Sequence, residues 1–172
     1  MTTEKRIKIL TESEVQEFYS PPLLTSNDQR FFFSFDEREH LACKKIRQRQ
    51  TRCMLALLLG YFKAKPVVLT PRYHQLKTDL KYISQGVFPG DGFAPFTLDR
   101  KEKDRIYSRI FELTGYQGWS NSTHLPSLLE YLNSQAQAWL APRHLFDSAI
   151  EYFSQHKIGE VLSAPPKYIG KN

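Results

Sequence analysis

The stretch QRQTRCMLALLLGYFK, residues 48–63, decides the fold of this 172-residue chain. Its apolar residues recur every three or four positions, at Met54, Leu55, Leu58, Leu59 and Phe62. This spacing places them on one face of an α-helix. The apolar run is interrupted at Gly60 and falls short of the eighteen or more residues that a membrane-spanning helix needs. The stretch therefore predicts an amphipathic helix that packs in a protein core, and not a membrane-spanning helix.

Helical start signals occur on both sides of this stretch. Thr11 and Glu14 have the spacing of a capping box, as do Ser34 and Glu37, and Thr25 or Ser26 can cap a helix between them. Downstream, Thr70-Pro71 predicts a helix that runs to about Ser84.

Three further helices are expected in the second half, over residues 97–114, 125–139 and 142–158. The only candidate strand is the short run 66–69. We therefore expect an all-α fold, made of two small helical subdomains with helix-turn-helix-like pairs.

The Gly- and Pro-rich run around residues 88–95 is the best internal boundary. The expected divisions are a DNA-binding subdomain 1–88, a linker 89–97, a second subdomain 98–158, and a tail 159–172. The tail is expected to be a linker to the remaining part of a longer protein.

Chemistry within the chain is not expected. The sequence contains no GxxxxGK[ST], HExxH or GxSxG motif, and Cys43 and Cys53 form no CxxC pair. We expect no catalytic residue, no metal site and no cofactor in this chain, and two reduced cytosolic thiols. No secretory signal is visible at the polar N-terminus.

Positive charge is concentrated in one window. Between Glu39 and Asp79 there is no acidic residue but nine Lys or Arg, although the net charge of the whole chain is only +6. A local field of one sign is what a polyanion selects for. Nucleic acid is the first hypothesis, and a well-solvated helix face is the ordinary alternative.

Within this window, Lys45, Arg49, Arg52, Ala56, Gly60 and Lys63 recur at three- and four-residue spacings. They share one helix face, and two interpretations remain open. The small residues either let a phosphate chain approach the backbone, or let a neighbouring helix pack closely.

The next helix, 72–81, is the first choice for insertion into a DNA groove, because its polar and basic groups lie opposite its apolar face. Base contacts are expected from a few side chains: His74, Gln75, Lys77 and Asn121. The turn 64–70 is longer than that of a compact helix-turn-helix.

Several segments resemble the N-terminal region of Tn-three-family replicative transposases. They are ILTESEVQEFY (9–19), FFFSFDE (31–37), RCMLALLLGYFKAK (52–65), IFELTGY (110–116) and the helix 142–158. The LGYFK part (59–63) is the most specific.

The resemblance implies that this is the portion of a DDE transposase that recognises the terminal inverted repeats of the transposon in double-stranded DNA. A distant RNase-H-like domain outside this chain would hold the Mg²⁺-dependent nuclease. The full-length protein would act as a dimer on DNA in the bacterial cytoplasm, associated with the nucleoid. The alternatives are a protein-interaction module for assembly of the transposase complex and, less favoured, a helical RNA-binding or DNA-damage protein.

The predicted DNA-binding residues are Lys44, Lys45, Arg47, Arg49, Arg52, Lys63, Arg72, His74, Lys77, Lys81, Arg105, Arg109 and Asn121.

Overall fold

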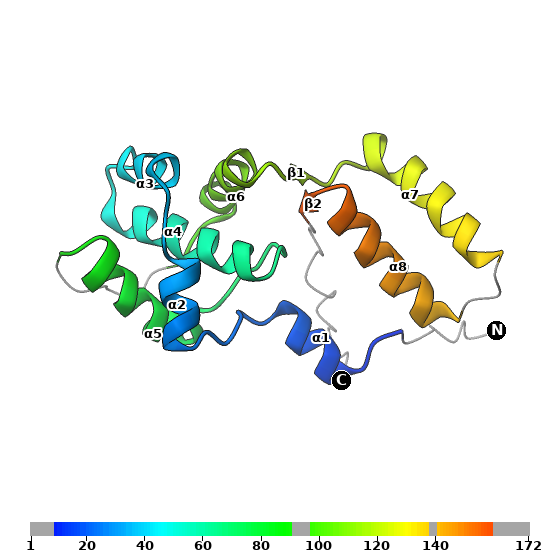
Figure 1. Ribbon diagram of the computed structural model, residues 1–172, viewed down its shortest axis with the longest axis horizontal. Helices are drawn as coiled ribbons and strands as arrows, with labels where there is room; N and C mark the ends of the chain where they lie inside the picture. The colour runs from blue at the N-terminus through cyan, green and yellow to red at the C-terminus, as the bar shows by residue number, and fades with distance from the viewer. Residues whose placement is uncertain (1–8, 91–96, 138–140, 160–172) are drawn as a thin grey trace, which may run out of the picture.

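The structure, a computed structural model, describes residues 9–90, 97–137 and 141–159, and over these residues the fold is all-α as expected (Figure 1). The helices are α1 (Glu12–Tyr19), α2 (Ser26–Phe32), α3 (Glu37–Lys44), α4 (Arg49–Ala64), α5 (Tyr73–Tyr82), the π-helix η1 (Ile83–Val87), α6 (Arg100–Thr114), α7 (Asn121–Ala136) and α8 (Pro142–Gln155). Two short strands, β1 (Gln117–Gly118) and β2 (Ile158–Gly159), pair in parallel.

The predicted core helix is the centre of the molecule. Every residue of α4 from Cys53 to Phe62 is buried, because α2, α3, α5 and α6 pack around it (Figure 1). Gly60 permits the closest of these approaches, since a Cβ atom there would collide with the ring of Phe33. We call α2 to α6, residues 26–114, the first bundle.

The second core is small. It consists of Leu128 from α7, Tyr152 from α8 and Ile158 from β2, with Trp119 and Phe153 packed against them. Figure 1 shows α7 and α8 as a helical hairpin beside the first bundle. We call residues 117–159 the α7–α8 hairpin.

The boundary between the two cores differs from the expected linker at 89–97, of which residues 91–96 lie outside the described part. Ile106, Tyr107 and Ile110 of α6 belong to the core around α4. The division therefore falls after α6, where Gly115 takes a left-handed conformation (φ 73°) and ends the helix. The expected second subdomain 98–158 joins α6 to the wrong core.

Several helix starts also differ from those predicted. Asp36 with Glu39, and Asp99 with Glu102, form the capping boxes of α3 and α6. α5 begins at Tyr73 rather than behind Thr70, because Arg72 takes the extended conformation of an N-cap (φ −82°, ψ 146°) and its N–H donates to Gln75 Oε1 (2.8 Å). The preceding segment is fixed at Leu69, whose N–H donates to the Tyr107 hydroxyl (2.7 Å) and whose carbonyl oxygen accepts from it (2.9 Å).

Candidate nucleic-acid interface

The connection between α3 and α4 presents three exposed cations, Lys44, Lys45 and Arg47. Arg52 fixes this loop from the first turn of α4. Its Nε (3.0 Å) and Nη2 (2.8 Å) both donate to the carbonyl oxygen of Ile46, and Nη2 also reaches Arg47 O (3.4 Å). Because Ile46 packs against the core, the loop is held at both its side chain and its backbone.

Helix α6 brings two further cations to the same place. Arg105 and Arg109 line a groove of about 430 Å³ together with Lys45. The other residues that line the groove are Ala42, Ile46, Gln48, Thr51, Leu55, Glu102 and Ile106. We call this the basic groove: an apolar floor with cations from the α3–α4 loop and from α6 on its sides.

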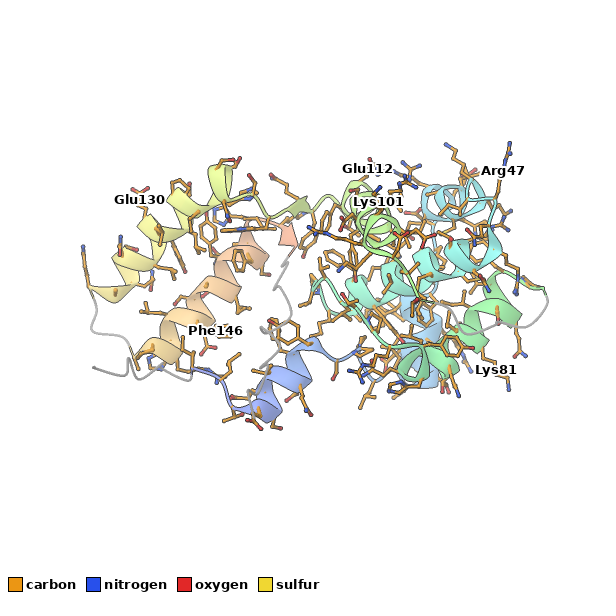
Figure 2. All side chains as sticks on the ribbon, turned by 180° about the vertical axis from the view of Figure 1, so that it is seen from behind. Arg47, Lys81, Lys101, Glu112, Glu130 and Phe146 are labelled. Carbon is orange, nitrogen blue, oxygen red and sulfur yellow. The ribbon has the colours of Figure 1, made fainter. Side chains whose placement is uncertain are left out.

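A second hollow of about 610 Å³ continues the basic groove along α3 and α6. The two share Ala42, Lys45 and Arg109. Figure 2 shows Arg47 on this edge of the first bundle, while Lys101 and Glu112 lie near opposite ends of α6, which is seen nearly end-on in this view. Three carboxylates, Asp36, Glu37 and Glu112, line this second hollow together with Arg38, Lys45 and Arg109, so the excess of positive charge is confined to the basic groove and the α3–α4 connection.

Most cations of this surface are not neutralised. In the part of the chain that the structure describes, no carboxylate forms an ion pair with Lys44, Lys45, Arg47 or Arg105. Arg109 differs, because its Nη1 lies 2.6 Å from Glu112 Oε2. The positive field of this surface consequently rests on the first four residues, of which Lys45 and Arg105 line the groove together with one carboxylate, Glu102.

The predicted exposed stripe along α4 is wrong. Ala56 is fully buried and Gly60 contacts Phe33, so the small residues serve close helix packing and no phosphate can reach them. Lys63, at the end of the stripe, forms an ion pair with Glu39 (2.7 Å). Of the two interpretations left open by the sequence, the packing one holds.

The guanidinium groups of Arg49 and Arg52 also turn inward. Arg49 Nη2 donates to the carbonyl oxygens of Ser84 (3.2 Å) and Phe88 (3.3 Å), at the end of η1. Arg52 holds the α3–α4 loop, as described above. Both guanidinium groups hold backbone carbonyl oxygens, and their predicted role as phosphate anchors stays a prediction.

The cations of α5 lie elsewhere. Arg72, His74, Lys77 and Lys81 are exposed, but Figure 2 places Lys81 at the edge of the bundle opposite Arg47. The exposed cations between Glu39 and Asp79, and Lys81 after them, therefore do not all lie at one edge of the bundle. Gln75, which was expected to contact bases, accepts a hydrogen bond from Arg72 N (2.8 Å) and caps its own helix.

A buried polar network that the sequence did not reveal positions α5. Asp79 accepts hydrogen bonds from Gln29 Nε2 (2.6 Å) and from the Tyr61 hydroxyl (2.5 Å), which joins α2, α4 and α5. Burial, and then the hydrogen bond to Asp79, raise the pKa of Tyr61. The tyrosine therefore remains a neutral donor to the carboxylate.

Asn121 lies apart from the cations, at the start of α7. Its Oδ1 accepts a hydrogen bond from Trp119 Nε1 (2.5 Å), and Ser120 N donates to His124 Nδ1 (2.9 Å). The α7–α8 hairpin carries Arg143 and Lys157 against Glu130, Asp147 and Glu151, a net charge of 2 − 3 = −1. It contributes no positive field of its own.

Among the described residues, no group of three or more His, Cys, Asp or Glu side chains is arranged to hold a metal ion. Over the same residues, no helix combines the length and the apolar character that crossing a membrane requires.

Comparison with known proteins gives one match. No curated protein and no solved structure matches the chain. A protein family described as a domain of unknown function (DUF4158) matches residues 9–159, which span all the helices described above. The chain belongs to this DUF4158 family.

Proposed function

We propose that this chain is a DNA-binding module of a Tn-three-family-like transposase, and that it recognises the terminal inverted repeats of the transposon. The observation that carries the proposal is the basic groove. Two elements distant in sequence, the α3–α4 loop and α6, bring Lys45, Arg105 and Arg109 to one hollow of the surface. Lys44 and Arg47 extend the same positive edge.

This arrangement suits a duplex backbone better than a small anion. The free cations are spread along a loop and a helix rather than gathered around one point, and they are exposed. Contacts of this kind position a protein on DNA without reading its sequence. Each phosphate that is neutralised releases counterions, so binding should weaken steeply as salt is added.

The experiment is a binding titration with an inverted-repeat duplex and a scrambled duplex of equal length, over a series of salt concentrations. Four phosphate contacts, by Lys44, Lys45, Arg47 and Arg105, give a slope of log affinity against log salt of about −4. Tighter binding to the inverted repeat would support recognition of the transposon end. Absence of binding to either duplex at low salt would contradict the proposal.

We expect no catalytic step within this chain. In this proposal the nuclease and its Mg²⁺ belong to a separate part of the transposase, and the module supplies only recognition. Incubation of labelled duplex with Mg²⁺ and this chain alone should leave the DNA intact.

A second candidate function concerns the α7–α8 hairpin alone. Leu125 and Leu129 on α7 are 38% and 50% exposed, and the hairpin lacks an excess of cations. These features favour a protein contact made during assembly of the transposase complex. Substitution of both leucines by Gln should then impair assembly and leave duplex binding by the first bundle unchanged.

A further inference from the structure

Helix α1 contacts both parts of the molecule although none of its residues is buried. On the side of the first bundle, Lys65 Nζ donates to Glu17 O (2.7 Å) and lies 5.4 Å from the centre of the Phe18 ring. Phe18 is also packed against the core of the first bundle. The C-terminal half of α1 is thereby attached to the end of α4.

The other contacts of α1 are made with α8. Arg143 Nη1 lies 2.5 Å from Glu14 Oε1, and the Phe18 and Phe146 rings meet edge to face with their centres 6.3 Å apart. Figure 1 shows α1 lying between the first bundle and α8. A single eight-residue helix therefore bridges the two cores.

Without α1, the hairpin would be attached at one end only. The chain enters it through Gly115, which has a left-handed conformation (φ 73°). Near this point the Phe111 ring packs against Gly118 and Gly159 of the two short strands. The start of α8, where Arg143 and Phe146 lie, is at the far end of that helix from β2.

We propose that α1 is a latch that fixes the orientation of the α7–α8 hairpin relative to the first bundle, with the Glu14–Arg143 ion pair and the Phe18–Phe146 contact as its releasable side. The ion pair is exposed, so salt screens it. The pKa of Glu14 is lowered to about 2, first by the backbone hydrogen bond from Thr11 and next by Arg143. The carboxylate is therefore ionised at neutral pH, and salt rather than pH opens the latch.

The consequence for DNA rests on the proposed function. The basic groove lies on the first bundle, whereas Asn121 and the polar start of α7 lie on the hairpin. A closed latch would hold these two regions at a fixed spacing along a duplex. An open latch would let them move independently, so that a second contact would no longer be pre-organised.

The latch can be tested without DNA, which separates its failure from failure of the proposed function. Fluorophores on Gln85→Cys and Asn133→Cys, both exposed, report the distance between the first bundle and α7. Cys43 and Cys53 are fully buried and do not compete for label. Hydrogen exchange of residues 12–19 provides an independent readout.

Arg143→Gln should broaden the distribution of distances and speed exchange of the α1 amides about two- to fivefold, as loss of an exposed ion pair predicts. Adding Phe146→Ala should increase both effects. Asp147→Asn is the matched control, because Asp147 forms the other ion pair of Arg143, which lies within α8. It should leave both readouts unchanged.

Glu14→Gln tests the same contact from the other side and does not alter α8. High salt should open the wild-type latch and have little further effect on Arg143→Gln. The proposal is overturned if Arg143→Gln, with or without Phe146→Ala, and Glu14→Gln all retain wild-type distances and exchange rates. It is also overturned if the Asp147→Asn control opens the hairpin equally.

Discussion

Replacing the two cations that line the basic groove without an ion pair to the described residues, Lys45→Gln with Arg105→Gln, gives the sharpest test of the interface. Four exposed cations supply its field, and this variant removes two of them. The salt slope should therefore become shallower by about 1.8, at 0.9 for each lost phosphate contact. The contribution of counterion release to binding is taken to vanish at 1 M salt. At 0.15 M salt the variant should therefore bind about thirtyfold more weakly than the wild type.

The matched control is Lys77→Gln with Lys81→Gln. It removes the same charge from exposed positions on α5, at the opposite edge of the bundle (Figure 2). Fluorescence anisotropy with a labelled inverted-repeat duplex at four salt concentrations measures both quantities for each variant. Equal losses in the two variants would show that only net charge matters. A larger loss in the α5 variant would move the interface to α5 and refute our choice of surface.

Three further predictions concern the scaffold that positions the interface. Gly60→Ala should destabilise the protein by about 1–3 kcal/mol in urea unfolding because it overpacks the core, whereas Gly86→Ala, where a Cβ meets nothing, should cost less. Asp79→Ala should cost about 1–3 kcal/mol, because it leaves two buried donors without their acceptor. Burial raises the pKa of Cys43 to about 12, so this thiol and Cys53 should resist iodoacetamide at pH 8 until denaturant is added. The Cys43 thiol of the unfolded chain ionises near pH 9.0, so the free energy of unfolding should fall as the pH rises from 9.0 towards 12. A free energy of unfolding that stays constant over this range would contradict the raised pKa of the buried thiol.

The parts of the fold that the sequence predicted well are those with a local cause. α4 was expected over 48–63 and is found over Arg49–Ala64, because a continuous apolar pattern can be satisfied only by burial. Thr11 with Glu14 caps α1 as predicted, through contacts within one turn. Tertiary contacts decided other parts: the segment before α5 is held at Leu69 by the hydroxyl of Tyr107, which is 38 residues further along the chain.

The interface was only partly predictable for the same reason. Helical spacing placed Arg49 and Arg52 on one face with Lys45, but spacing does not reveal which backbone carbonyls a long side chain will reach. The convergence of Lys45 with Arg105 depends on α6 packing against α4, which the expected linker at 89–97 had separated.

In the α7–α8 hairpin, the apolar pattern of the sequence also predicted only part of the observed burial. The stripe predicted on α7 is buried at Leu128 but exposed at Leu125 and Leu129, and its last member, Trp139, lies outside the described residues. On α8, Tyr152 is buried, whereas Leu145, Phe146 and Phe153 are only partly buried. Two helices enclose too little volume to bury every apolar position of both.

The most direct test of the central claim is hydrogen exchange of the intact chain with and without a saturating inverted-repeat duplex. If DNA lies along the basic groove, amides of residues 42–47 and 102–109 should both be protected, while those of residues 73–82 should exchange at their original rates. Protection confined to residues 73–82, or no protection on either side of the groove, would contradict the account.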